Sequence, residues 1–140
     1  NNAPFDHLQI FIRPNTKDTY IYNNLIHISE KAKLKIDTRN DGTLNDWKNN
    51  LFFGNLVIDG ASDYEHNGTE LFSNPLLSNP GGTTASDYKL QSTSPAIGSG
   101  YIINGSDDVK NYIQNNGGRD YFGNSVSSDS KPNIGAYNGN

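Results

Sequence analysis

The sequence lacks several features that define common classes of protein. It has no cysteine, which excludes a disulfide framework and a thiolate metal site. No apolar run approaches the roughly 18 residues that a membrane-spanning helix needs, so we expect no membrane span. The formal net charge is −4 and basic residues form no stripe, which argues against nucleic acid as a partner. Serine-hydrolase elbows, phosphate loops and dinucleotide fingerprints are also missing.

Hydrophobic residues are scarce as well. They make up 33% of the chain, against the roughly 45–50% of apolar residues in typical globular domains. Disordered chains are poor in aromatic residues and high in net charge, whereas this chain has 8 Tyr and 6 Phe. Asparagine is the residue in excess. The composition therefore favours a turn-rich β protein.

Short apolar runs alternate with asparagine-rich breaks in the first half of the chain. Each run is rich in β-branched and aromatic residues and lies close to turn-forming residues, which is the pattern of strands. The runs are Leu8-Gln9-Ile10-Phe11-Ile12, Tyr20-Ile21-Tyr22, Leu25-Ile26-His27-Ile28, Leu34-Lys35-Ile36, Leu51-Phe52-Phe53 and Leu56-Val57-Ile58.

An internal repeat relates two of these regions. Ile21-Tyr22-Asn23-Asn24-Leu25-Ile26 matches Trp47-Lys48-Asn49-Asn50-Leu51-Phe52, at an offset of about 26 residues that is typical of solenoids. Asparagine tolerates the left-handed backbone that a sharp corner between strands needs, and its amide can bond the equivalent Asn of the next coil. We therefore predict stacked β-helix coils in residues 1–60. The alternatives are two unrelated hairpin turns and a β-sandwich.

The second half of the chain, residues 61–140, has a different texture. It is mostly polar and is interrupted by Pro and Gly, so we expect a last coil, loops and a capping segment there. Ser94 begins a predicted helical turn with Pro95 at its first position. One amphipathic helix is predicted near residues 107–115, where it would cover the open end of the coils.

Five spaced segments of this half resemble the closing region of bacterial right-handed parallel β-helix proteins. Such proteins include pectate-lyase-like polysaccharide lyases, β-helix glycoside hydrolases and surface proteins. The sequence departs from the usual pattern at Gly98 and Asn138, where acidic residues are common. The segments are Leu71-Phe72-Ser73-Asn74-Pro75-Leu76-Leu77, Asp87-Tyr88-Lys89-Leu90-Gln91, Ser94-Pro95-Ala96-Ile97-Gly98-Ser99-Gly100, Gly118-Arg119-Asp120-Tyr121-Phe122-Gly123 and Ile134-Gly135-Ala136-Tyr137.

This resemblance implies an all-β fold, a right-handed parallel β-helix with a loop-rich cap and one short helix. It also implies the C-terminal part of a secreted or cell-surface bacterial protein that acts on acidic polysaccharide, with a lyase favoured over a hydrolase. Most catalytic residues would then lie outside this chain, and the N-terminal remainder of the β-helix would be its partner as a second chain. The alternative is a non-catalytic surface adhesin or glycan-binding module.

The densest charge lies in residues 31–42 and supplies the candidate catalytic groups. By resemblance, lyases of this kind use Lys or Arg as the base that removes the proton next to a uronate carboxylate. Lys33, Lys35 and Asp37 alternate along one predicted strand and so share a side of it, while Arg39 can pair with a substrate carboxylate. The two lysines are the catalytic candidates, and Asp37 and Arg39 are substrate-binding candidates. The alternative is a solvated, mixed-charge surface.

Two aromatic residues complete the set of candidates, because the face of an aromatic ring complements the C–H face of a sugar. Trp47 and Tyr64 could each stack on a pyranose, and the alternative for both is packing within the fold. The three histidines show no metal-ligand spacing, so we predict no metal site and no cofactor in this chain. By resemblance, calcium would belong to the full-length protein.

Overall fold

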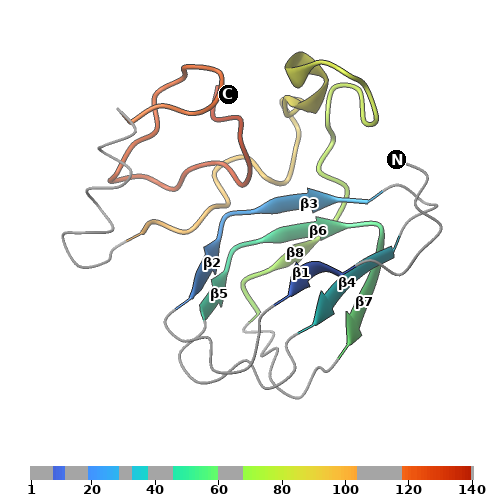
Figure 1. Ribbon diagram of the computed structural model, residues 1–140. Helices are drawn as coiled ribbons and strands as arrows, with labels where there is room; N and C mark the ends of the chain where they lie inside the picture. Colours follow the sequence, from blue (N-terminus) through green and yellow to red (C-terminus); the bar gives the residue numbers. More distant parts are fainter. Residues whose placement is uncertain are drawn as a thin grey trace.

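The computed structural model describes residues 8–11, 19–28, 33–37, 46–59, 68–103 and 118–139. The described elements are short strands and one 3₁₀ helix (Figure 1). They are β1 (Leu8–Phe11), β2 (Tyr20–Tyr22), β3 (Leu25–His27), β4 (Lys33–Asp37), β5 (Asp46–Lys48), β6 (Leu51–Phe53), β7 (Asn55–Asp59), β8 (Leu71–Phe72) and η1 (Ala85–Tyr88). None of the helices in this part of the chain has the length and apolar character to cross a membrane.

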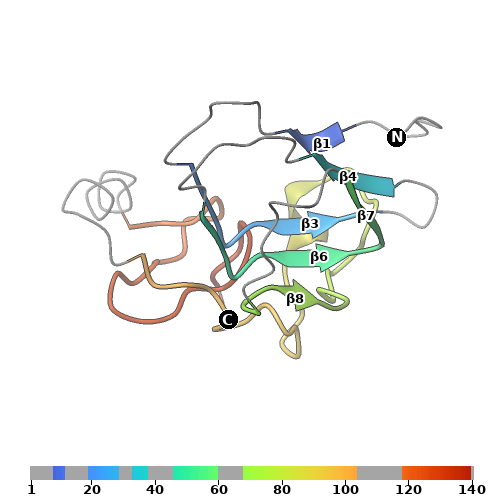
Figure 2. The same ribbon diagram turned by 90° about the horizontal axis from the view of Figure 1, so that it is seen from below.

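The strands pair in parallel and form three small sheets. Their orders are β1-β4-β7, β2-β5 and β3-β6-β8, and Figure 2 shows the strands of the last sheet side by side. Ile21 lies opposite Trp47, and Leu25 lies opposite Leu51. The predicted equivalence of the two repeat copies is therefore confirmed as strand pairing. Parallel pairing excludes the two hairpins that were the alternative, because hairpin strands are antiparallel.

The two Asn-Asn corners have the predicted backbone conformation. Asn23 and Asn49 have φ angles of 58° and 51°, in the left-handed region that asparagine tolerates. The second asparagine of each pair joins the copies: Asn50 Oδ1 accepts hydrogen bonds from the backbone N–H and the side-chain amide of Asn24, each at 3.0 Å. Asn50 is buried, and its amide also donates to the Ile21 carbonyl at 2.8 Å.

The predicted right-handed parallel β-helix, however, is wrong. The described residues form separate sheets of two or three strands, and these do not close into a solenoid. A solenoid is stabilised by successive repeats that stack along their whole length. Here the third layer is incomplete: β7 pairs with β4 along five residues, β8 adds only two residues beside β6, and among the described residues no third strand pairs with β5. Beyond Phe72 the described chain consists of turns, η1 and isolated antiparallel bridges. These residues therefore supply no strand for a further coil.

The closing segments pack together on strand β6. Leu77, Leu90, Ala96 and Ile134 are buried with Leu51 in one core cluster, so four of the five segments of the second half meet on the first half. Ser94 caps its turn as predicted, because its Oγ accepts the Ala96 N–H at 3.2 Å. The helix predicted near residues 107–115 lies outside the described residues. This packing forms a buried apolar cluster within the described part of the chain, despite the low hydrophobic content of the sequence.

Candidate functional site

Strands β2 and β5 have one apolar side and one polar, aromatic side. Successive side chains of a strand point to opposite faces, and Ile21 pairs with Trp47, whose side chain is 4% exposed. The flanking positions therefore face the other way. These flanking residues are Tyr20, Tyr22, Asp46 and Lys48.

A tyrosine–lysine cluster covers this polar side. Tyr22 Oη donates a hydrogen bond to Asp46 Oδ2 at 2.5 Å, and Lys48 Nζ lies 2.6 Å from the same oxygen. The ammonium of Lys48 also lies 5.3 Å from the ring centre of Tyr22 and 4.7 Å from that of Tyr101. Both distances are within the range of cation–π attraction. Tyr20 extends the cluster outward, 5.7 Å from the Tyr22 ring and 61% exposed. We define the cluster as these five residues.

Tyr101 joins the cluster through the Asn-Asn corners. Asn23 bonds the backbone of Tyr101 through both ends of its side-chain amide, and Asn49 donates to the Ser99 carbonyl at 2.8 Å. On the other side, the Gly100 N–H donates to the Pro132 carbonyl at 2.8 Å. The segment that carries Tyr101 is thus held between the strand corners and the C-terminal loop.

Three groups of the cluster, those of Tyr22, Asp46 and Lys48, have shifted pKa values. Burial and the hydrogen bond with Asp46 raise the pKa of the Tyr22 phenol to about 12. The hydrogen bond with Asp46 also raises the pKa of Lys48 above its ordinary value. Burial acts to raise the pKa of the Asp46 carboxyl, but hydrogen bonds from Lys48 and Tyr22 outweigh it and lower that pKa. At neutral pH, Lys48 is therefore an ammonium, Asp46 a carboxylate and Tyr22 a neutral phenol.

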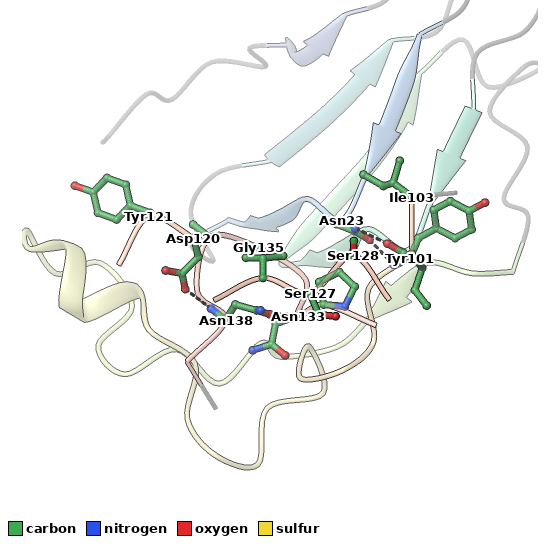
Figure 3. A pocket seen from close by; sticks show the side chains of 14 residues that line it. Asn23, Tyr101, Ile103, Asp120, Tyr121, Ser127, Ser128, Asn133, Gly135 and Asn138 are labelled. Atoms are coloured by element: carbon green, nitrogen blue, oxygen red, sulfur yellow. Dashed lines mark hydrogen bonds between the residues drawn. The ribbon is translucent and has the colours of Figure 1, made fainter. Parts of the chain in front are cut away.

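A cavity of about 190 Å³ adjoins the cluster and shares Tyr101 as part of its wall. Figure 3 shows Tyr101 and Tyr121 on opposite sides of the lining, with Asn23, Ser128 and Asn133 between them. Hydroxyl and amide groups among these residues can donate and accept hydrogen bonds. The cavity therefore offers polar partners beside the aromatic rings.

Asp120 organises one wall of this cavity. Its Oδ1 accepts the N–H groups of Phe122 and Asn124, both at 2.8 Å, and its Oδ2 accepts the Asn138 N–H at 2.5 Å. Burial acts to raise the pKa of the Asp120 carboxyl, but these hydrogen bonds and one from the Asn124 amide outweigh it and lower that pKa. Because these hydrogen bonds occupy the carboxylate, Asp120 stabilises the shape of the wall and is not a free acceptor for a ligand.

The site candidates from the sequence lie apart from this cluster or outside the described side chains. Lys33, Lys35 and Asp37 occupy alternate positions of β4, where Lys35 lies opposite Val57 and Asp37 opposite Asp59. The structure describes their backbone only, so their roles stay predictions, and Arg39 and Tyr64 lie outside the described residues. Trp47 is described and faces the interior, where its ring is not available to a sugar.

The sequence reasoning missed the cluster residues although one signal was present. The repeat aligns Tyr22 with Lys48, and the alternation around the buried pair Ile21 and Trp47 places their neighbours on the opposite face. No local signal marks Tyr101. Its position depends on the hydrogen bonds of Asn23, which lies 78 positions earlier in the chain.

Within the described residues, no group of three or more His, Cys, Asp or Glu side chains could hold a metal ion. Comparisons with family models, curated proteins and solved structures return no match for this chain. The function is therefore argued from the chemistry of the cluster.

Proposed function

We propose that this chain binds polysaccharide through the tyrosine–lysine cluster, as a glycan-binding part of a secreted or cell-surface protein. The observation that carries the proposal is that the Lys48 ammonium contacts both the Tyr22 and the Tyr101 ring, with Asp46 beside it and Tyr20 exposed. Sugar recognition needs aromatic surface for C–H faces and paired donors and acceptors for hydroxyl groups. The cluster supplies both on one strand face.

The protonation states favour binding over catalysis at this cluster. A general acid or base works best when its pKa lies near the operating pH. The pKa of Tyr22 is raised to about 12, that of Lys48 is raised and that of Asp46 is lowered. All three groups are therefore held in one state at neutral pH. That is suitable for a fixed hydrogen-bonding surface and unsuitable for proton transfer.

A glycan array followed by calorimetry tests the proposal on the 140-residue chain. We expect binding to at least one class of oligosaccharide. Tyr20→Ala is expected to lower the affinity by about two- to tenfold, the equivalent of ~0.5–1.4 kcal/mol for one stacked ring. Lys48→Met and Asp46→Ala remove the polar partners and are expected to lower the affinity further.

Phe72→Ala is the matched control. Phe72 is an exposed ring on β8, at the edge of the β3-β6-β8 sheet and outside the tyrosine–lysine cluster. Its loss should therefore leave the affinity unchanged. Circular dichroism checks that each variant keeps its β structure. Folded wild-type chain that binds no glycan, or binding that is indifferent to all three cluster variants, would overturn the proposal.

A further inference from the structure

The cavity beside Tyr101 has walls that are fixed to one another by hydrogen bonds. The Asn23 side chain bonds the backbone of Tyr101 at two points, and the Asn23 carbonyl accepts the Gly135 N–H at 2.9 Å. The Gly100 N–H donates to the Pro132 carbonyl at 2.8 Å. The strand corner, the segment that carries Tyr101 and the C-terminal loop are thus joined in pairs. The cavity is therefore present without a ligand, as is usual for binding sites of small groups.

Aliphatic side chains form much of the lining. They are Ile102, Ile103, Val126, Pro132 and Ala136. Figure 3 places Ile103 beside Tyr101 at one end of the lining. Tyr101 also belongs to the tyrosine–lysine cluster, where its ring centre lies 4.7 Å from the Lys48 ammonium. The cavity and the cluster therefore share one residue, and a glycan bound at the cluster can reach the cavity.

Most amide groups of the lining are already engaged within the protein. The side chains of Asn23, Asn133 and Asn138 each accept one hydrogen bond from the backbone and donate another to it. Ser127 Oγ accepts two backbone N–H groups and can still donate its own proton. The Ser128 hydroxyl forms no hydrogen bond within the part of the chain that the structure describes. Ser128 is therefore the polar side chain of the lining that is free for a ligand.

The charge of the lining disfavours an anionic ligand. Among the described residues it contains no Lys, Arg or His, and its one charged side chain is that of Asp120. A carboxylate or sulfate would be repelled by this carboxylate and would lose water without gaining a cation. Four hydrogen bonds already occupy the Asp120 carboxylate, so it offers little to an ammonium group. The lining therefore suits a neutral ligand.

The size of the cavity limits the ligand further. At about 190 Å³, the cavity is smaller than the roughly 300–1,000 Å³ of sites for drug-sized ligands. It is therefore suited to one substituent of a sugar and not to a disaccharide. Aliphatic walls and one free hydroxyl match a substituent that has a small apolar part and a hydrogen-bond acceptor.

We propose that this cavity is a subsite for an acetyl group of a glycan bound at the tyrosine–lysine cluster. This inference rests on the proposed function. The methyl of the acetyl group is buried against the aliphatic side chains, and its carbonyl oxygen accepts a hydrogen bond from the Ser128 hydroxyl. The amide-linked acetyl of an acetamido sugar and the ester-linked acetyl of an O-acetylated sugar share this chemistry.

Matched pairs of neutral oligosaccharides test this selectivity by calorimetry on the 140-residue chain. Chitohexaose and cellohexaose differ only in the acetamido or hydroxyl group at the second carbon of each sugar. An O-acetylated mannohexaose and its deacetylated form differ only in the ester. We expect the wild-type chain to prefer the acetylated member of one pair by about tenfold, from one buried methyl and one hydrogen bond. The pair that shows the preference identifies the linkage.

Two variants of the lining separate its apolar and polar parts. Ala136 is exposed at the edge of the cavity, so Ala136→Leu fills the space with little effect on the fold. It should abolish the preference and leave the affinity for the unacetylated member within about twofold. Ser128→Ala removes the hydroxyl and should reduce the preference by about threefold, whereas Ser128→Thr keeps the hydroxyl and should retain most of it.

Ser130→Leu is the matched control for Ala136→Leu. Ser130 is an exposed residue of the same loop and does not belong to the lining, so this variant should keep the preference of the wild type. Urea unfolding of each variant separates a loss of recognition from a loss of stability.

The outcomes distinguish this inference from the function on which it rests. A wild-type chain that binds both members of each pair equally, with binding that depends on Tyr20 and Lys48, overturns the acetyl subsite alone. A preference that survives unchanged in Ala136→Leu or Ser128→Ala, or that is lost equally in Ser130→Leu, also overturns it. Tighter binding of de-N-acetylated chitohexaose than of chitohexaose would do so too. A wild-type chain that binds no glycan overturns both proposals.

Discussion

The side-chain amide of Asn23 holds the backbone of Tyr101 at two points. Asn23 Oδ1 accepts the Tyr101 N–H at 2.6 Å, and Asn23 Nδ2 donates to the Tyr101 carbonyl at 2.9 Å. The same asparagine turns the chain from β2 into β3 with a φ of 58°. One residue therefore forms the strand corner and places the Tyr101 ring 5.2 Å from the Tyr22 ring.

Substitution of Asn23 separates these two roles. Asn23→Gly keeps the left-handed backbone accessible and removes both side-chain hydrogen bonds, so we expect it to lower the free energy of unfolding by about 1–3 kcal/mol. Asn23→Ala also removes both hydrogen bonds but keeps a Cβ in the left-handed region, which alanine tolerates less well than asparagine or glycine, and should cost about 1–2 kcal/mol more than Asn23→Gly. Urea denaturation measures both values. Equal stability of wild type and Asn23→Gly would contradict the role of the amide.

A methyl group at Gly100 should disturb the cluster more than the core. A Cβ there would lie 2.7 Å from the Pro132 carbonyl oxygen and 2.8 Å from Pro132 Cγ, so the backbone that carries Tyr101 must move. We expect Gly100→Ala to lower stability by about 1–3 kcal/mol and to abolish glycan binding. Gly98→Ala is the control, because a Cβ there meets nothing within 4 Å although φ is +61°. It should cost about 1–2 kcal/mol of strain and leave binding intact.

The phenol of Tyr22 should lose its proton at a higher pH than an ordinary tyrosine. Its folded pKa of about 12 lies above the model-peptide value of roughly 10. A raised pKa means that this contribution to stability is fully present below pH ~10 and is lost as pH rises through the folded pKa. Phenolate absorbance of wild type minus that of Tyr22→Phe isolates the titration. In Asp46→Asn the transition should move to lower pH, since the Asp46 hydrogen bond and charge raise the pKa. An unchanged midpoint would exclude this coupling.

Asn50 should be the most sensitive asparagine of the two Asn-Asn corners. It is fully buried and bonds both Asn24 and Ile21 of the neighbouring copy. Asn50→Ala leaves those partners unsatisfied and should cost about 1–3 kcal/mol for each one. Asn55→Ala, at an exposed asparagine of β7, should stay within about 0.5 kcal/mol of wild type. Thermal or urea unfolding compares the two variants, and similar losses of stability would contradict the role of Asn50 in joining the two copies of the repeat.

Asp120 should make the stability dependent on acid pH. Its pKa is lowered by hydrogen bonds that outweigh burial. Its contribution is therefore present above the unfolded pKa of roughly 3.9 and is lost as pH falls through the folded pKa. Asp120→Asn should lower the free energy of unfolding at pH 7 by about 1.5–3 kcal/mol. It should also weaken the dependence of that free energy on pH in the acid range. Unfolding free energies measured from pH 2.5 to 7 test this, and a mutant profile parallel to wild type would contradict it.

Local features of the fold could be predicted from the sequence. The apolar runs that include Leu25-Ile26-His27 and Leu51-Phe52-Phe53 form strands, and the repeat pairs them in the expected register. The Asn-Asn corners have the expected backbone. These features depend on residue type and on neighbours within a few positions. Closure into a solenoid was predicted wrongly, because it depends on whether every sheet continues from one layer to the next. Among the described residues the β2-β5 sheet gains no third strand, and β8 adds only two residues beside β6.

The candidate site was less accessible to prediction. Trp47 and Lys48 are adjacent in sequence, but one is buried and the other lies among aromatic rings. Alternation along a strand predicts that they face opposite ways, and only packing decides which face becomes interior. The sequence pattern singled out Trp47 as a sugar-binding candidate, while the structure presents Lys48.

The sequence by itself determined the corners, the strand register and the turn at Ser94, because each follows from backbone preference or from local repetition. Only the tertiary structure decided that Tyr101 meets Tyr22 and Lys48, and that Lys89 meets Phe122 and Tyr137. Such contacts join segments tens of residues apart. They arise from the packing of the closing segments on Leu51 and from the hydrogen bonds of Asn23, and no local pattern of residues encodes them.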